Sequence, residues 1–172
     1  MSDVRVLEPQ DAPALIELRR EALDAHPLVF GASPEDDRGL ALEFVRGALD
    51  PGARERNAVF GLYDRGALAG MAGVVRATQL KRRHSGHIWG MYVTPRARGR
   101  GGGRALLEAA IAHACAWAGM SVLSISVTTA APQALGLYLD AGFRVWGREP
   151  RALSVDGTVV DEIHLTMSLD GS

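Results

Sequence analysis

Glycine and arginine dominate residues 96–103, RARGRGGG, immediately before a segment with helical spacing of apolar residues. The first turn of a helix exposes unpaired N–H groups and about half a positive charge, and such a turn binds phosphate groups. Glycines remove the side chains that would keep an anion away from this backbone, while Arg98, Arg100 and Arg104 add positive charge. Residues 65–107 contain nine Lys or Arg and no Asp or Glu. We therefore predict that this loop binds a small anion such as a pyrophosphate.

Two common phosphate-loop patterns do not fit this loop. A Walker loop requires G-x-x-x-x-G-K-[ST], and no glycine of the chain is followed by that pair. The dinucleotide fingerprint G-x-G-x-x-G begins with Gly99 and Gly101, but Arg104 stands where its third glycine belongs. The sequence therefore disfavours ATP, GTP and NAD as ligands.

Two segments together resemble the signatures of the GNAT N-acetyltransferase superfamily. YVTPRARGRGGGRALL resembles the acetyl-CoA signature [QR]-x-x-G-x-[GA], with Arg98, Gly101 and Gly103 at its fixed positions. APQALGLYLDAGFR resembles the second signature, N-x-x-A-x-x-L-Y-x-x-x-G-F. Its matching positions are Ala134, Leu137, Tyr138, Gly142 and Phe143. Ala131 replaces the motif asparagine and Gly102 stands at a usually apolar position, so both departures are expected to weaken cofactor binding.

The resemblance implies a cofactor, an activity and a fold. The cofactor would be acetyl-CoA, which leaves as CoA after its acetyl group has passed to a primary amine. The fold would be α/β (α+β), with a mixed, mostly antiparallel sheet of about six to seven strands and helices on both faces. The N–H groups of Met91 or Val93 would pair with the pantetheine arm. The pyrophosphate would lie against the loop residues Arg98, Gly99, Arg100, Gly101, Gly102, Gly103 and Arg104.

Tyr138 is the predicted general acid, because it occupies the tyrosine position of the second motif. A CoA thiolate needs a proton as it leaves, and a tyrosine with the reference pKa of ~10 still carries one at neutral pH. The general base is less well defined by the sequence. His87 titrates in a suitable range, and Glu149 and Glu162 are alternatives that act directly or through water.

The resemblance also implies an acceptor pocket that is lined by the loop between the first two helices and by the C-terminal hairpin. The first of these segments, HPLVFGASPEDD, and the second, EPRALSVDGTVVDE, both carry acidic residues, which favours a cationic amine. Phe30 and Trp146 are candidates for an apolar wall of the pocket. No metal site is predicted.

The order of expected elements is β-α-α-β-β-β-α-β-α-β-β, which places the glycine loop between a strand and the third helix. A first helix over residues 12–26 buries Leu15, Leu18 and Ala22. A second helix is expected to begin after Ser33 as N-cap and to run to about residue 49. After the fourth helix, a strand over residues 143–147 precedes a closing hairpin over residues 153–169.

Bulk properties suggest a single cytoplasmic domain, residues 1–172, with a net charge of −1 and one cysteine, Cys115. We expect no signal peptide, no membrane span and no nucleic-acid partner, and a homodimer is compatible with the sequence. Three alternatives stay open: a catalytically silent module that binds CoA or acetyl-CoA, transfer of a longer acyl group, and a nucleic-acid binder that uses KRRH at residues 81–84 with the loop. The last lacks aromatic residues among its basic ones.

Overall fold

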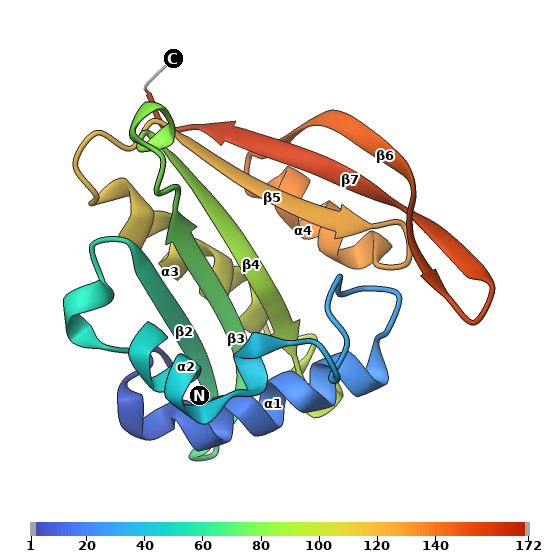
Figure 1. The fold of residues 1–172 in the computed structure, drawn as a ribbon, viewed down its shortest axis with the longest axis horizontal. Helices are drawn as coiled ribbons and strands as arrows, with labels where there is room; N and C mark the ends of the chain where they lie inside the picture. The colour runs from blue at the N-terminus through green and yellow to red at the C-terminus, as the bar shows by residue number, and fades with distance from the viewer. Residues whose placement is uncertain (1–2, 171–172) are drawn as a thin grey trace.

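A computed structural model of the chain describes residues 3–170, which form a seven-stranded sheet with helices on both faces (Figure 1). The strand order is β1-β2-β3-β4-β5-β7-β6. The strands are β1 (Asp3–Val6), β2 (Asn57–Asp64), β3 (Ala67–Arg76), β4 (Ser85–Val93), β5 (Val122–Thr128), β6 (Arg144–Val155) and β7 (Thr158–Ser168). Neighbouring strands are antiparallel except for the β4–β5 pair, so the predicted mixed, mostly antiparallel sheet is confirmed.

The helices are α1 (Ala12–Ala25), α2 (Leu42–Ala48), α3 (Gly102–Cys115) and α4 (Pro132–Asp140). Two buried clusters lie on the two faces of the sheet. One cluster joins α3 and α4 to the sheet and includes Leu106, Leu107 and Phe143. The other joins α1 and α2 to it and includes Leu15 and Leu18. The predicted element order and the helices on both faces are confirmed (Figure 1). No described helix is long and apolar enough to span a bilayer.

The second helix was predicted to begin after Ser33, and this prediction is wrong, because α2 begins only at Leu42. Residues 33–40 instead form a turn followed by a short 3-10 helix, Arg38–Leu40, and aspartate side chains hold both. The Asp36 carboxylate accepts from the Ser33 N–H at 2.8 Å, and the Asp37 carboxylate accepts from the Gly39 N–H at 2.9 Å. Aspartate side chains compete in this way with helical hydrogen bonds.

The expected strand at 143–147 and the first arm of the closing hairpin form one long strand, β6, rather than two. Its pairing with β7 is interrupted by a register shift between Glu149 and Leu153. Within that interruption Arg151 has a φ of 58°. This local bulge lies between the two segments that were expected to be separate strands.

Strands β4 and β5 pair over a short stretch and then diverge. Their parallel register covers only residues 85–87 with 122–124 among the described residues. Beyond this stretch the two strands separate, and Figure 1 shows the gap widening toward the end of β4 that leads into the α3 loop. The edges of the two strands that face each other are therefore unpaired beyond this stretch.

Candidate functional site

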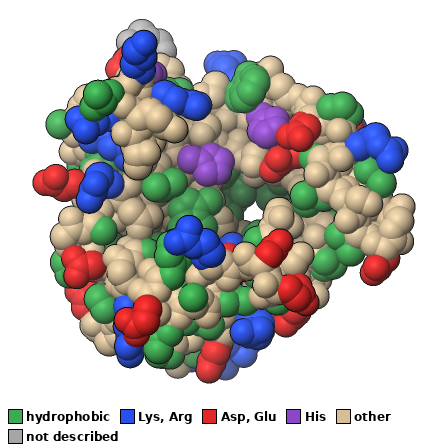
Figure 2. Space-filling model, viewed as in Figure 1, with side chains coloured by type: hydrophobic (Ala, Val, Ile, Leu, Met, Phe, Trp, Pro, Cys, Tyr) green, Lys and Arg blue, Asp and Glu red, His purple; other side chains and the backbone are tan. Residues whose placement is uncertain are grey.

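Two adjoining cavities occupy the space between the diverging strands. The large cavity, about 580 Å³, lies beside the glycine loop and α4. The small cavity, about 200 Å³, lies over the middle of β4, between α1 and β7. Five residues line both: Val29, Phe30, Met91, Ala134 and Tyr138. In the space-filling view the same face is hollowed between β4 and β5, with acidic, basic and histidine side chains around the hollow (Figure 2).

The glycine loop forms one end of the large cavity. Gly101 is the N-cap of α3 and has a φ of 80°, a conformation that L side chains rarely adopt. No side chain caps this helix, so the first N–H groups of α3 stay available to a ligand. Gly99, Gly101, Gly102 and Gly103 all line the large cavity. The loop therefore fits an anionic group such as a pyrophosphate, without a side chain between it and the backbone.

The three arginines of the loop take different places. Arg98 lines the large cavity, where its Nε donates to the Val93 carbonyl at 2.8 Å. Arg100 pairs with Asp64 at 3.3 Å, and Arg104 lies 3.7 Å from Asp140. The side chains of Arg100 and Arg104 are not among the residues that line either cavity. Any contribution of these two residues to a ligand in the large cavity would come from their backbone.

Gly102 is buried because α3 begins directly against β2. A Cβ atom at this position would lie 2.5 Å from Leu62 Cδ2, and Leu62 is itself 1% exposed. The apolar residue usual in the motif would therefore not fit here without repacking. Gly102 was expected to weaken cofactor binding. In the structure, the absence of a side chain at Gly102 allows the first turn of α3 to lie close to the sheet.

We expect Gly102→Ala to lower stability, although alanine favours a helix by ~1 kcal/mol over glycine. Overpacking a full core costs ~1–3 kcal/mol, and this cost exceeds the gain. The melting temperature of the ligand-free protein measures the balance. The matched control is Gly136→Ala in α4, where an added Cβ meets nothing within 4 Å and should stabilise the protein. A Gly102→Ala protein that melts above the wild type would contradict this packing argument.

The edge of β4 offers backbone groups to the large cavity. The Thr94 N–H donates to the Ala69 carbonyl of β3 at 2.8 Å, and N–H groups alternate along a strand, so the Val93 N–H faces away from β3. Three residues before Val93, Gly90 has a φ of 65° and the register with β3 shifts, which forms a bulge. Met91 follows this bulge and lines both cavities. The predicted arm-binding strand therefore presents Met91 and Val93 to the cavity walls.

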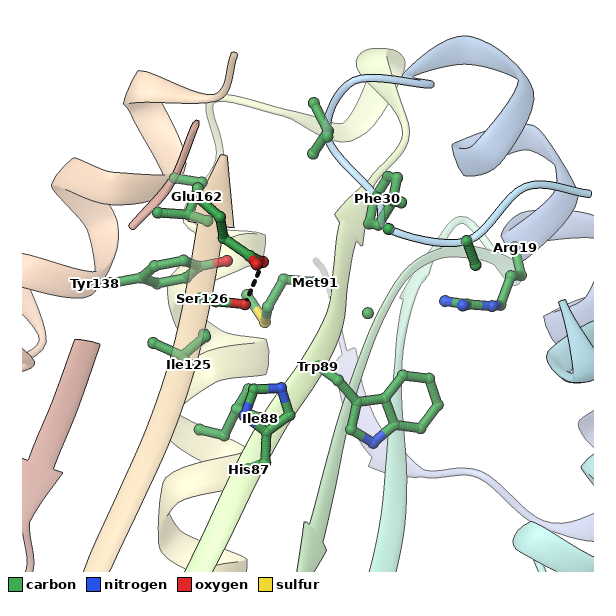
Figure 3. Close-up of a pocket in the computed structure, with 16 residues that line it drawn as sticks. Arg19, Phe30, His87, Ile88, Trp89, Met91, Ile125, Ser126, Tyr138 and Glu162 are labelled. Carbon is green, nitrogen blue, oxygen red and sulfur yellow. Dashed lines mark hydrogen bonds between the residues drawn. The ribbon is translucent and has the colours of Figure 1, made fainter. Parts of the chain in front are cut away.

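Tyr138 stands at the junction of the two cavities. Its side chain is 4% exposed and packs edge-on against Phe143, with 6.4 Å between ring centroids. Figure 3 shows the hydroxyl pointing from α4 toward Met91 and Ser126. Burial raises the pKa of Tyr138 well above its ordinary value of 10.0. The hydroxyl has no hydrogen-bond partner among residues 3–170, and the raised pKa keeps it protonated at neutral pH.

Glu162 is the acidic residue that faces the small cavity. It lies on β7, and its carboxylate accepts from the Ser126 hydroxyl at 2.7 Å (Figure 3). Its neighbour on β6, Glu149, is directly opposite in register but more exposed and outside the cavity lining. His164 lies 3.4 Å from Glu149 and 3.9 Å from Glu162. The structure thus brings Glu162, and not Glu149, to the same cavity as Tyr138.

His87 lines the small cavity from β4, and its Nδ1 lies 3.0 Å from the Ser124 hydroxyl. Partial removal of the ring from water lowers the pKa of His87 below its ordinary value of 6.5, against the opposing charge of Glu162. The ring is therefore mostly neutral at pH 7.

Trp146 does not reach either cavity: it is 67% exposed on β6 and stacks beside His164. Phe30 lines both cavities.

Three residues with polar side-chain atoms that line the small cavity were not found from the sequence. Arg19 on α1, Trp89 on β4 and Ser126 on β5 all line the small cavity. Arg19 lies on the polar side of an amphipathic helix, where an arginine carries no signal of its own. In the sequence, Trp89 is an ordinary strand residue. Its ring fits because Gly73, which is opposite on β3, has no side chain: a Cβ atom on Gly73 would lie 2.2 Å from the indole. Only the fold brings these three residues together.

Comparison with known proteins identifies the family. The model of the Acetyltransferase (GNAT) family matches residues 15–143. A GNAT-family acetyltransferase from Streptococcus pneumoniae superposes with a TM-score of 0.85 at 22% identity, over 98% of this chain and 100% of its own. The yncA protein of Salmonella typhimurium, solved with acetyl-CoA, gives 0.84 at 20% identity, over 100% and 96%. A GNAT phosphinothricin acetyltransferase of Sinorhizobium meliloti, also solved with acetyl-CoA, gives 0.82 at 22%, over 98% and 88%.

No curated protein matches the chain. The family match covers the glycine loop, the diverging strands, α4 and the five residues that line both cavities, whereas Glu162 on β7 lies outside it. Because the family model spans well over half of the sequence, this chain belongs to the GNAT acetyltransferase family.

Proposed function

We propose that the protein transfers an acetyl group from acetyl-CoA directly to a primary amine. The observation that carries this proposal is the junction of the two cavities at Tyr138 and Met91. The large cavity has the glycine loop and an unpaired strand edge, which suit CoA. The small cavity has a carboxylate and suits the amine. Two similar structures, from Salmonella typhimurium and Sinorhizobium meliloti, were solved with acetyl-CoA, which supports the assignment of the large cavity.

The backbone of residues 99–104 would hold the pyrophosphate at the N-terminus of α3. The Val93 N–H, which faces away from β3, would pair with an amide of the pantetheine arm. The N–H of Met91, at the junction, would donate to the thioester oxygen and stabilise the negative charge that develops there during transfer. Ala131 lines the large cavity with a methyl group only, so the pantetheine arm would lack the side-chain contact that the motif asparagine would supply.

Proton transfers would be divided between the two walls of the junction. An ammonium loses one proton to Glu162, directly or through a water, before its nitrogen attacks the carbonyl carbon. The carbon–sulfur bond then breaks, the thiolate takes the proton of the Tyr138 hydroxyl, and the second proton that the nitrogen loses returns to the Tyr138 oxygen, directly or through a water. Ser126 donates to Glu162 and holds its carboxylate toward the cavity. His87, with its lowered pKa, is a neutral neighbour in this scheme rather than the base.

The first test is the melting temperature with and without saturating acetyl-CoA, with ATP and NAD as controls. A ligand at 100 times its Kd adds ~2.7 kcal/mol of stability, which raises the melting temperature of a domain of this size by several degrees. We expect a rise with acetyl-CoA alone. No rise would overturn the proposal. A rise without release of CoA in the presence of any amine would favour the catalytically silent binding module instead.

A further inference from the structure

Arg19 is the basic side chain on the wall of the small cavity that faces Glu162 and Tyr138. Figure 3 shows its guanidinium reaching from α1 toward the cavity, above the ring of Trp89. Its Nε donates to Asp37 at 2.5 Å, and both side chains are largely buried, with 13% and 9% exposed. The two terminal nitrogens have no hydrogen-bond partner among the residues that the structure describes. Four N–H donors at the end of this guanidinium therefore stay free beside the cavity.

The position of this guanidinium is fixed from several sides. Asp37 holds its Nε edge and is itself held by the Gly39 N–H. A Cβ on Gly39 would lie 2.9 Å from Arg19 Nε, so the close approach depends on this glycine. Trp89 lies below, with 5.6 Å from Arg19 Cζ to the ring centroid, a cation–π distance. A side chain held in this way can recognise a partner with little loss of conformational entropy.

The acidic residues expected to attract a cationic acceptor are mostly occupied elsewhere. Asp37 pairs with Arg19, and Asp36 caps the turn at Ser33. Of the acidic residues, Glu162 is the one that lines the small cavity, and Arg19 stands on the opposite wall. The cavity thus offers one negative and one positive group. This pattern matches a zwitterion better than a simple cation.

We propose that the acceptor amine belongs to a small amino acid, whose carboxylate pairs end-on with the two terminal nitrogens of Arg19 while its amine lies between Glu162 and Tyr138. This proposal rests on the proposed function and names its substrate class. The end of a guanidinium matches the two oxygens of a carboxylate in a two-pronged pair, which a lysine does not reproduce. The size also agrees: a cavity of ~150 Å³ holds a benzene-sized ligand, and the small cavity measures about 200 Å³.

The test compares each amino acid with its own carboxamide. The panel contains the L-α-amino acids, β-alanine and γ-aminobutyrate, each beside the amide that lacks the negative charge, and CoA release gives kcat/KM. For the preferred acceptor we expect the acid to exceed the amide ~10²-fold, since a site that binds a charged group rejects an analogue without it. In Arg19→Gln the acid-to-amide ratio of kcat/KM should fall close to the value that the different basicities of the two amines produce without an enzyme. In Arg19→Lys the ratio should lie between this value and that of the wild type.

The neighbouring Arg20→Gln is the matched control, because Arg20 is exposed on the same helix and lies outside both cavities. It should leave the ratio unchanged. The acetyl-CoA melting shift in each variant shows that the protein is folded and that the large cavity is intact. Amides turned over as well as acids by the wild type, or an unchanged ratio in Arg19→Gln, would overturn the amino-acid proposal alone. A wild type that binds acetyl-CoA but acetylates no member of the panel would also overturn the amino-acid proposal, whereas a wild type that releases no CoA with any other primary amine either would overturn the proposed function together with it.

Discussion

Tyr138→Phe is expected to lower kcat ~10²–10³-fold, within the usual range for loss of a general acid. The substitution removes one hydroxyl and keeps the ring that packs against Phe143, so the core around α4 should be preserved. The hydroxyl points into the cavity junction and has no partner among residues 3–170 that it would leave behind. The acetyl-CoA melting shift should therefore match that of the wild type, and the loss should appear in turnover and not in cofactor binding.

Tyr63→Phe provides the control for this experiment. It removes a tyrosine hydroxyl from β2, where that group accepts from Arg5 and donates to Asp11, away from both cavities. It should affect stability and leave kcat unchanged. Turnover of Tyr138→Phe near the wild-type value, with an intact fold, would remove Tyr138 from the proposed mechanism.

The pH profile gives a second view of the same residue. Burial raises the pKa of Tyr138 above 10.0, so the acid stays protonated as the pH rises through the range where a free tyrosine would lose its proton. We therefore expect kcat to show no alkaline decline from Tyr138 below pH ~10. Meanwhile the amine substrate deprotonates, which by itself increases the rate. An alkaline decline that disappears in Tyr138→Phe would mean that the hydroxyl titrates far lower than its buried position implies.

The sequence predicted the parts of the site that are local in the chain. A glycine loop next to a helix start is a local feature, and so is the spacing that places Tyr138 on one short helix, four residues before the Gly142 that follows its end. The element order was also local, because each strand and helix has its own periodicity. The divergence of β4 and β5 is not local: it depends on how residues 85–87 meet residues 122–124.

What the sequence could not predict are contacts between distant segments. Glu149 and Glu162 were equivalent candidates, and they are distinguished only by the strand order, which places β7 and not β6 beside β5, and by the hydrogen bond from Ser126 to Glu162. Trp146 was expected on a wall of the pocket, but its place on the exposed side of β6 depends on strand pairing. The sequence did not indicate that Arg19 belongs to the site, because its position depends on an ion pair with Asp37, and the segment that contains Asp37 was predicted to be helical.

Glu162→Gln is expected to lower kcat/KM ~10²-fold at neutral pH, the loss of a general base at the small cavity. The change keeps the volume of the side chain and an oxygen that can still accept from Ser126, so the walls of the cavity should stay in place. It removes the group that takes a proton from the ammonium. Glu149→Gln is the matched control, because this residue is more exposed on the neighbouring strand and does not line the cavity.

The pH dependence separates a base from a binding group in this variant. At neutral pH most of an α-amino group with a pKa near ~8 or above is an ammonium that needs a base, whereas well above that pKa the amine arrives unprotonated. The deficit of Glu162→Gln relative to the wild type should therefore shrink as the pH rises, provided that proton removal is the role of Glu162. A deficit that stays constant with pH would assign Glu162 to holding the acceptor. Glu149→Gln should show no deficit at any pH, since its carboxylate lies outside the cavity where the proton is lost.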